Sequence, residues 1–465
     1  MFKIYNTATK KKEEFVPVKR GQVGMYSCGP TVYDVSHIGN LSSFIFADVI
    51  RRWLEFLDYK VISVLNVTDV EDKIIRNCDK TMSGLKTYTS KYEKLLLEDL
   101  DRLMIEPMEF YPRATEHIKE MVQLIKTLME KGHAYEKDGS VYFRINSFPD
   151  YGKFAGLDLE NLKIGASVDT DDYDKEDARD FVLWKGWKPD EDGEVYWDTE
   201  IGRGRPGWHI ECSAMCMKYL GETVDIHTGG VDLIFPHHQN EIAQSEAATD
   251  KQFVKYWMHR EFLNISGDKM SKSAGTGASL SEIAPTSLDI AAFRYLIVSA
   301  HYRSPLHFSA KSMDAAKNAV SNLRNMYSRL NGIKTPGEDM VKDIVASARD
   351  KFVKSMNDDL NTPNAIAAVF ELMNEIEKSM QDNTLTRASA QSVVSFIREV
   401  DKIFAVIVNE SIERELTDEE ADLISQREQA RKDKDWKLAD DLRDKLIEKG
   451  VVVEDTAKGT RHFFV

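Results

Sequence analysis

Cysteine is scarce in this sequence, and long apolar runs are missing. Four of the 465 residues are cysteine, at positions 28, 78, 212 and 216, which are too few and too unevenly spaced for a disulfide framework. No segment approaches the roughly 20 apolar residues that span a bilayer. Residues 1–15 hold a lysine cluster without the apolar core of a secretory signal. We therefore expect a cytoplasmic protein without membrane contact.

An excess of positive charge is also lacking. The 62 basic and 77 acidic residues give a net charge of −15, which has the wrong sign for general affinity to nucleic acid. A nucleic-acid-binding protein of this composition must confine its positive potential to one face. The length exceeds what a single core supports, so about three or more domains are expected.

The N-terminal part of the chain predicts a nucleotide-binding sheet. Residues 23–28 read as a short strand, a helical pattern starts at Asn40, and residues 60–65 predict a buried parallel strand. Strand, helix and strand over roughly 45 residues make a βαβ unit, from which doubly wound parallel sheets are built. Residues 113–205 look like an insertion, and a strand at 224–227 indicates that the sheet then resumes.

After residue 308 the pattern becomes helical. Apolar residues at helical spacing form a stripe from Met313 to Leu330. A second helix is predicted to begin at Asn361-Thr-Pro363, because a capping residue is followed by proline in the first turn. Residues 423–449 predict two charged helices, and their basic residues and Trp436 suit contacts to phosphates and an unpaired base.

The junction between the first strand and helix carries residues suited to phosphate. His37-Ile-Gly39-Asn40 opens the helix, whose N-terminus offers unpaired N–H groups and partial positive charge. Gly39 allows close approach of a ligand, and the His37 ring and the Asn40 amide can donate hydrogen bonds. Taken alone, this tetrapeptide is more often an ordinary helix cap.

Two other segments suit the same nucleotide. Lys269-Met-Ser-Lys272-Ser lies in a polar loop after a strand predicted over 257–265, and mobile ammonium groups there can follow negative charge onto pyrophosphate. Gly230 and Asp232 follow another predicted strand, where glycine permits close approach and a carboxylate suits ribose hydroxyls. Each signal is weak by itself.

Four residues that are distant in sequence form a candidate zinc set. Cys28 ends the first strand, Cys212 lies on a helix predicted from residue 208, and His237 and Glu241 share a face of a predicted helix. In a doubly wound sheet the strand ends converge at the nucleotide site. Two thiolates, an imidazole and a carboxylate are a plausible set for Zn²⁺, and a purely structural zinc is the alternative.

These motifs, in this order, resemble the signatures of class I aminoacyl-tRNA synthetases, and the residues between them resemble the cysteinyl-tRNA synthetase family. The matching segments include Cys28-Gly-Pro-Thr-Val-Tyr-Asp34, Pro236-His-His-Gln-Asn-Glu241 and Asn357-Asp-Asp-Leu-Asn-Thr-Pro363. The resemblance covers nearly the whole chain. Where the family usually has a second histidine, this chain has Asn40, whose amide donates but cannot be charged.

The resemblance implies ATP-dependent ligation of L-cysteine to tRNA(Cys) through a cysteinyl-adenylate, with release of AMP and pyrophosphate. It implies a monomer that binds one Zn²⁺ per chain, to select the cysteine thiolate, and Mg²⁺ with the ATP. The implied metal ligands are Cys28, Cys212, His237 and Glu241. The implied cysteine-binding residues are Cys28, Gly29, Thr31, Thr68 and Trp208. The implied ATP-binding residues are His37, Gly39, Gly230, Asp232 and Lys272. The implied catalytic residues are His37, Asn40, Lys269 and Lys272.

The expected fold is α/β, with a Rossmann-type doubly wound parallel sheet, an inserted α+β subdomain, an α-helical bundle and a small C-terminal domain. The predicted parts are two catalytic halves, an inserted acceptor-end subdomain, a linking subdomain with the lysine loop, a tRNA-binding bundle and an anticodon-binding domain. In the same order, their boundaries are 1–112 with 206–262, 113–205, 263–308, 309–409 and 410–465.

Two other functions remain open at this stage. A related ligase activates cysteine and passes it to an amino sugar, but it would lack the C-terminal tail. A catalytically weak tRNA-binding homologue is the second alternative, and Asn40 favours it. Among the remaining candidates, Cys216 is expected to be an inert buried thiol and Cys78 a surface or loop residue. Four histidines are expected to pack, to face solvent or, for some of them, to hydrogen-bond the metal ligands, rather than to catalyse, namely His209, His227, His238 and His259.

Overall fold

The computed structural model describes the chain except for residues 158–179, 266–277, 408–415, 450, 457–458 and 465. The described residues form two compact units. The first comprises Met1–Leu280, Ala300–His307 and Met356–Asn361, and the second comprises Ser281–Ser299, Phe308–Ser355 and Thr362–Val465. Within the described ranges, no helix has the length and apolar character that crossing a membrane requires.

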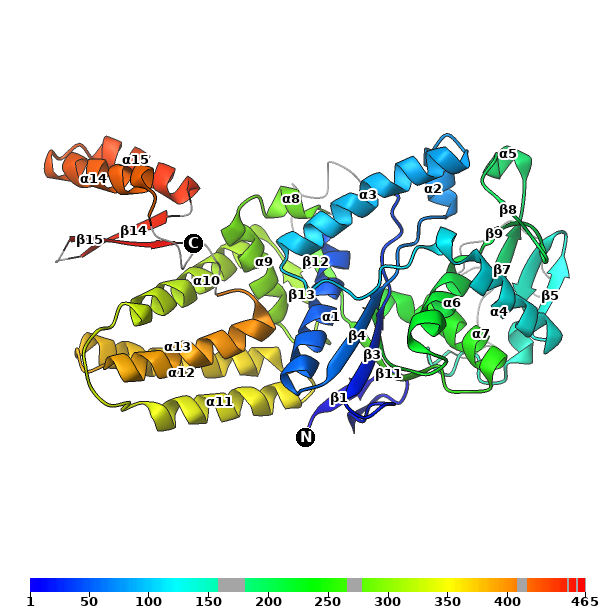
Figure 1. The fold of residues 1–465 in the computed structure, drawn as a ribbon, viewed down its shortest axis with the longest axis horizontal. Helices are drawn as coiled ribbons and strands as arrows, with labels where there is room; N and C mark the ends of the chain where they lie inside the picture. The colour runs from blue at the N-terminus through cyan, green and yellow to red at the C-terminus, as the bar shows by residue number, and fades with distance from the viewer. Residues whose placement is uncertain (158–179, 266–277, 408–415, 450, 457–458, 465) are drawn as a thin grey trace. The chain divides into compact units, whose positions relative to one another are not determined.

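A four-stranded parallel sheet forms the centre of the first unit (Figure 1). Its strands are β3 (Gln22–Ser27), β4 (Lys60–Leu65), β10 (Val224–Gly230) and β11 (Val254–Arg260). Their order in the sheet is β11-β10-β3-β4. The chain runs from β3 to β4 on one side and later adds β10 and β11 on the other. The order therefore reverses between β3 and β10, and in such sheets ligands bind beyond the carboxyl ends of the strands at this point.

Helices cover both faces of this sheet (Figure 1). On one face lies α1 (Ile38–Phe56), and on the other lie α6 (Trp208–Leu220) and α7 (Gln239–Thr249). Alternation along β3 sends Tyr26 into a core with Cys212 and Met215 of α6. The remaining elements of the sheet's surroundings are β1 (Lys3–Asn6), β2 (Lys11–Glu14), α2 (Asp72–Asn77), α3 (Met82–Arg102), η3 (Val231–Leu233), η4 (Ile234–His238), β12 (Leu263–Ile265) and β13 (Leu306–Phe308).

The insertion is an α+β subdomain, as the sequence predicts. Its five antiparallel strands have the order β5-β6-β7-β9-β8, and buried aromatic residues including Phe143, Phe181 and Trp184 fill its core. The elements are η1 (Ala114–Glu116), α4 (Ile118–Glu130), β5 (Ala134–Lys137), β6 (Ser140–Phe143), η2 (Ile145–Ser147), β7 (Phe181–Gly186), α5 (Pro189–Asp192), β8 (Trp197–Thr199) and β9 (Gly202–Pro206).

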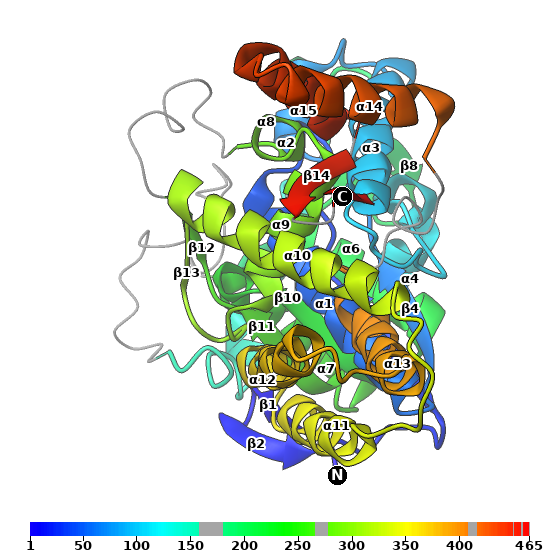
Figure 2. The same cartoon turned by 90° about the vertical axis from the view of Figure 1, so that its left-hand side faces the viewer.

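The second unit is mainly helical. The apolar stripe predicted from Met313 to Leu330 is buried on one helix, and the helix predicted near Pro363 begins at Thr362. The long helices run alongside one another (Figure 2). Its elements are α8 (Leu280–Ile283), α9 (Ser287–Val298), α10 (Ala310–Asn331), α11 (Lys342–Asn357), α12 (Thr362–Gln381), α13 (Arg387–Phe404), α14 (Asp418–Lys432), α15 (Trp436–Glu448), β14 (Val451–Thr456) and β15 (Gly459–Phe464).

The described structure differs from the sequence-based elements at one strand that leads toward the site. The strand predicted over 257–265 is two strands, β11 and β12, separated by Glu261 and Phe262. Periodicity cannot detect this break, because Phe262 is apolar and yet 52% exposed. The expected α/β fold is otherwise confirmed.

Candidate active site

The carboxyl edge of the sheet and two helices converge on a group of metal-binding side chains. Cys28 follows β3, Cys212 lies on α6 and Glu241 lies in the first turn of α7. The Sγ atoms of Cys28 and Cys212 are 4.0 Å apart, and Cys28 Sγ lies 3.8 Å from Glu241 Oε1. His237 Nε2 lies 3.1 Å from the same oxygen. One ligand atom from each of these four residues lies within 4.8 Å of the others, so the structure brings the predicted set together.

An irregular turn directs two adjacent histidines into this group. The segment η4 contains non-helical backbone and a proline, which disfavours helical angles in the residue before it. His237 and His238 both approach Glu241 Oε1, with their Nε2 atoms 3.1 and 3.9 Å away. They precede Glu241 by four and three residues, so both lie on the face of the helical turn that meets this carboxylate.

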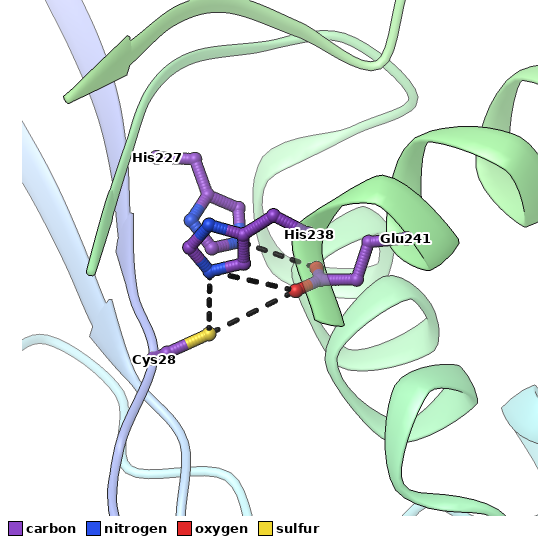
Figure 3. Close-up of side chains that lie close together, drawn as sticks. All are labelled: Cys28, His227, His238 and Glu241. Atoms are coloured by element: carbon purple, nitrogen blue, oxygen red, sulfur yellow. Dashed lines mark hydrogen bonds and ion pairs between the residues drawn. The ribbon is translucent and has the colours of Figure 1, made fainter. Parts of the chain in front are cut away.

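A second ligand set overlaps the first. Cys28, His227, His238 and Glu241 also have ligand atoms within 4.8 Å of one another, and Figure 3 shows their side chains meeting. Cys28 Sγ lies 3.3 Å from His238 Nε2, and His227 Nε2 lies 3.1 Å from Glu241 Oε2. The two sets share Cys28 and Glu241, so one ion excludes the other. The first set offers the softer ligands to a metal ion, because only the first set contains two sulfur atoms.

The electrostatics of the first set favour a cation at its centre. Burial disfavours ionisation of Glu241, but His227 and His237 outweigh it and lower the pKa of this carboxyl to about 2. Burial likewise opposes a charged His237, yet Cys212 and Glu241 raise its pKa to about 10. Burial opposes ionisation of Cys212, and a hydrogen bond from Cys28 and the charge of His237 lower its pKa to about 6. Burial and the neighbouring Cys212 raise the pKa of Cys28. The cluster thus stabilises negative charge around a positive centre.

Spacing and support of the ligands fit zinc. Two sulfur atoms bound at about 2.3 Å in a tetrahedron lie about 3.8 Å apart, close to the 4.0 Å between Cys28 and Cys212. His237 Nδ1 lies 2.8 Å from His209 Nδ1, a hydrogen bond that fixes the orientation of the His237 ring. The first set therefore has both the donor chemistry and the orienting contact of a zinc site.

The residues expected to bind the rest of cysteine lie on the loops after β3 and β4. Thr31 and Thr68 form a short parallel bridge, and Gly29 N donates to Asn66 Oδ1 at 2.8 Å. A Cβ atom at Gly29 would lie 1.6 Å from the carbonyl oxygen of Asn66, so the close approach of the two loops requires glycine. These contacts hold both loops beside the metal-binding group.

Helix α6 contributes two further side chains at this place. Trp208 stacks on the His237 ring with centroids 4.1 Å apart and is 39% exposed, so it lies between the cluster and solvent. Glu211 is buried, accepts a hydrogen bond from Thr68, and has no hydrogen bond from any described residue to Oε2. Burial and nearby acidic groups, Cys212 foremost, raise the pKa of Glu211 well above its usual value.

His37 caps α1 in a way that fixes its tautomer. Its Nδ1 accepts from the backbone N–H groups of Gly39 and Asn40 at 3.1 and 3.3 Å, so in the neutral ring Nε2 carries the proton. Partial burial lowers the pKa of His37, although Asp232 opposes this. A Cβ atom at Gly39 would lie 2.9 Å from the His37 ring. The neutral ring therefore presents an Nε2–H donor at the start of α1.

The other ATP-binding candidates are described only in part. Gly230 ends β10, and the exposed Asp232 follows it near enough to act on the charge of His37. Lys269 and Lys272 lie outside the described residues. Ser279, which follows their segment, pairs antiparallel with His37. The described chain therefore resumes at Ser279 beside the predicted phosphate site.

Comparison with known proteins agrees with this arrangement. The family described as "tRNA synthetases class I (C) catalytic domain" matches residues 14–318, the "DALR domain" matches 351–408, and the "Cysteinyl-tRNA ligase anticodon binding domain" matches 413–462. The chain is 44% identical over 466 residues to the cysteine–tRNA ligase of Solibacter usitatus (strain Ellin6076), with 99% of this chain and 98% of that protein covered. This chain belongs to the cysteine–tRNA ligase family.

Other cysteine–tRNA ligases are comparably similar. That of Chlamydia pneumoniae is 42% identical over 463 residues, with 98% of this chain and 97% of that protein covered. Among solved structures, the Mycobacterium tuberculosis methionyl-tRNA synthetase in complex with methionyl-adenylate has a TM-score of 0.62 at 14% identity, covering 83% of this chain and 92% of that one. That likeness shows the fold. The predicted family is confirmed, and the protein is an aminoacyl-tRNA ligase.

The C-terminal domain of this ligase presents part of the predicted tRNA-binding surface. Trp436 begins α15 and is 59% exposed, as stacking on an unpaired base requires. Lys434 and Arg443 are exposed as well. Arg427, which the basic pattern includes, is buried, because α14 turns this position toward the interior.

Sequence reasoning about this ligase expected the nearby histidines to pack, to face solvent or in part to hydrogen-bond the ligands, and it missed Glu211. His227, His238 and His259 are buried and His209 is half-buried, so they pack around the cluster and do not face solvent. His238 Nδ1 lies 2.8 Å from His259 Nε2. His227 and His259 both lie in the second halves of the adjacent strands β10 and β11, near the carboxyl edge where the site is expected, and this position was an available signal. Glu211 is adjacent to Cys212 and carries no motif of its own.

Proposed function

We propose that this ligase selects cysteine through a zinc ion held by Cys28, Cys212, His237 and Glu241. Family membership carries the overall reaction, in which cysteine is joined to tRNA(Cys) at the expense of ATP. The observation that supports the zinc ion is the pair of cysteine sulfurs 4.0 Å apart, facing a buried imidazole and carboxylate. Zinc in this place supplies a soft Lewis acid that prefers a thiolate to the hydroxyl of serine.

The chain's own residues prepare the pocket for the thiol. Cys212 and Glu241 favour their anionic forms, and His209 orients the His237 ring. Trp208 covers the His237 ring and limits access of water to the sulfur site. We assign the remaining contacts to cysteine to Gly29, Thr31 and Thr68, on the paired loops after β3 and β4. Since serine lacks the soft ligand, this pocket discriminates at the binding step.

We assign the ATP phosphates to the N-terminus of α1. There the Nε2–H group of His37, the Asn40 amide and the backbone beside Gly39 donate to phosphate oxygens, and Gly230 and Asp232 hold the ribose. We assign charge stabilisation on the leaving pyrophosphate to Lys269 and Lys272, with Mg²⁺ bound alongside ATP.

The chemical steps need no protein nucleophile. A carboxylate oxygen of cysteine attacks the α-phosphorus of ATP, the bond to the bridging oxygen of pyrophosphate breaks, and cysteinyl-adenylate forms. A terminal ribose hydroxyl of the tRNA then attacks the cysteinyl carbonyl carbon, and AMP leaves. The protein contributes position and charge.

We assign tRNA binding to the helical bundle and the C-terminal domain, with Trp436 as a stacking residue. The match of residues 413–462 to the anticodon-binding domain supports this assignment over an amino-sugar acceptor. A monomeric, cytoplasmic enzyme is part of the proposal, and the low cysteine content supports the compartment. Sedimentation equilibrium measures the mass directly, and a value near 53.1 kDa supports the monomer.

The deciding experiment is ATP–pyrophosphate exchange followed by charging of tRNA. We expect exchange that depends on cysteine, is not supported by serine, and leads to cysteinyl-tRNA(Cys) when that tRNA is added. Absence of cysteine-dependent exchange would contradict the proposal and leave a tRNA-binding homologue. Exchange without charging would instead indicate a different acceptor. The Lys272→Ala variant should lower the exchange rate more than it weakens ATP binding.

A further inference from the structure

One carboxylate beside the metal-binding group has an oxygen that no described side chain or backbone group hydrogen-bonds. Glu211 is 1% exposed in the first turn of α6, directly before Cys212. Thr68 hydrogen-bonds to it, and no described residue hydrogen-bonds to its Oε2. The charged groups that act on Glu211 are themselves acidic, namely Cys212, Asp69 and Glu71. A buried carboxylate oxygen in such surroundings is costly unless a donor reaches it, and a cationic donor satisfies both the hydrogen bond and the charge.

Neighbouring carboxylates do not share this condition. Asp69 accepts hydrogen bonds from the backbone and hydroxyl of Thr115 at 2.9 and 2.6 Å. Glu71 caps α2 and accepts from the backbone of Lys73 at 2.7 Å. Both oxygens of Asp69 are therefore used within the protein, and Glu71 is only half-buried. Among these three, Glu211 alone combines full burial with an oxygen that no described residue reaches.

We propose that Glu211 binds the α-ammonium group of cysteine and thereby selects an amino acid over other thiols. The assignment rests on the proposed function, in which the sulfur of cysteine lies at the metal held by Cys28 and Cys212. The sulfur and nitrogen of cysteine are attached to adjacent carbons, and the Glu211 side chain lies close enough to the metal ligand Cys212 for their charges to interact. Thr68, which contacts Glu211, lies on the loop that pairs with the one after Cys28. A ligand anchored through its sulfur therefore presents its amine near the unused oxygen.

The helix dipole adds to the stabilisation that a bound cation gives the Glu211 carboxylate. Glu211 lies in the first turn of α6, where the helix dipole favours an anion. The same turn begins with Trp208, which covers the His237 ring. One helical turn thus carries the covering aromatic residue, the amine-binding carboxylate and a metal ligand, and this links recognition of sulfur and nitrogen in one rigid element.

The test compares cysteine with 3-mercaptopropionate, which has the thiol and the carboxylate but no amine. Binding of each compound to zinc-loaded protein is measured by calorimetry for the natural protein, Glu211→Gln and the control Glu71→Gln. The control removes a nearby carboxylate that is already hydrogen-bonded. We expect the natural protein to prefer cysteine by about 10- to 100-fold, the worth of a charged hydrogen bond. We expect Glu211→Gln to lose that preference by weakening cysteine alone, and Glu71→Gln to keep it.

The possible outcomes distinguish a failure of the role of Glu211 from a failure of the proposed metal site for the cysteine sulfur. Equal affinity of the natural protein for both thiols overturns the role of Glu211 without any variant, and leaves the metal assignment intact. Equal weakening of both thiols by Glu211→Gln also overturns it, since that pattern indicates structural support. If neither thiol binds the zinc-loaded natural protein, the sulfur site itself is wrong and the role of Glu211 falls with it. Zinc content and thermal unfolding of each variant verify that the fold and the metal are retained.

Discussion

The first unit contains two buried groups of charged side chains, and they balance charge in opposite ways. The ion-pair cluster consists of Asp72, Lys185, Asp192 and Arg205. Arg205 Nε lies 2.9 Å from Asp192 Oδ1 and Lys185 Nζ lies 2.8 Å from Asp72 Oδ2, while Arg205 also pairs with Asp72. Two acidic and two basic groups thus neutralise one another. In the metal cluster, the groups that favour the anionic forms of Cys212 and Glu241 are the thiol of Cys28 and two imidazoles.

This difference separates a structural cluster from a binding site. The ion-pair cluster ties α2 to strands of the inserted sheet and needs nothing from outside the chain. The metal cluster stabilises anions whose balance, in the described residues, depends on a protonated His237. A divalent cation provides that balance more fully, and its ligands must give up protons to bind it. A buried group of acidic side chains with too few cationic groups to neutralise it therefore indicates a site for a ligand.

The largest effect should come from removing a sulfur atom. We expect the natural protein to bind one zinc per chain and Cys212→Ser to lose it, with cysteine-dependent exchange lower by at least about 1000-fold. Metal analysis and pyrophosphate exchange measure both quantities. Cys216→Ser is the matched control, because Cys216 is buried on the same helix but belongs to neither ligand set. Full zinc content in Cys212→Ser would place the ion in the set with His227 and His238.

The ion-pair cluster should respond in stability and not in metal binding. Arg205→Met leaves two carboxylates facing each other, so we expect a loss of about 3–5 kcal/mol of local stability. Hydrogen exchange of the amides in β7 and β9 measures it. Zinc content should remain one per chain. The double variant Arg205→Met with Asp192→Asn should recover part of the loss, because it removes one of the uncompensated charges. Loss of zinc from Arg205→Met would contradict the conclusion that the ion-pair cluster is independent of the metal cluster.

The sequence alone predicted the strands, helices and caps that depend on contiguous or periodically spaced residues. The strand at 60–65 coincides with β4, and the apolar stripe of α10 and the start of α12 follow from spacing and capping. The His37 segment could be predicted as a helix start, because the residues that form and cap a helix N-terminus are neighbours in sequence. Such features depend on local geometry, which one sequence contains.

The parts that escaped prediction depend on tertiary contacts. The sequence indicated Cys28, Cys212, His237 and Glu241 through their donor chemistry and the expected convergence of strand ends, and the family resemblance supported the set. Their distances could not be predicted, because three different segments of the chain bring them together. His238 lies three residues before Glu241, and only the packed structure shows that the Cys28 sulfur reaches the same imidazole. Glu211 was not predicted, because the feature that marks it is a buried carboxylate oxygen without a hydrogen bond from any described residue. Only the packed structure shows this feature.

The histidines around the cluster offer a way to sharpen the choice between its two ligand sets. Orienting contacts of metal ligands are worth about 10- to 100-fold in affinity. His209 contacts His237 of the first set, whereas His238 is itself a member of the second. We expect His209→Gln to weaken zinc binding by about that factor and His238→Gln by about threefold or less. Competition with a chelator measures both, and the reverse order would favour the second set.

The smallest effect concerns the carboxylate at the edge of the ion-pair cluster. Burial opposes ionisation of Asp72, but Arg205 and Lys185 outweigh it and lower its pKa to about 2. A carboxyl whose pKa is lower in the folded than in the unfolded state stabilises the fold above the unfolded pKa, near 4. That contribution is lost as the pH falls from about 4 to about 2. Because the side chain is 31% exposed, solvent screening limits it to about 1–2 kcal/mol.

Asp72→Asn should therefore lower the stability of α2 and β7 by about 1–2 kcal/mol at neutral pH and by little near pH 2. Hydrogen exchange at the two pH values measures the difference, and Asp198→Asn serves as a control because Asp198 pairs with Arg203 at an exposed site. A loss that persists near pH 2 would mean that the asparagine disturbs packing, and not charge. A pH-dependent loss with unchanged zinc content would show that the chain's own cations neutralise this cluster, in contrast to the metal site.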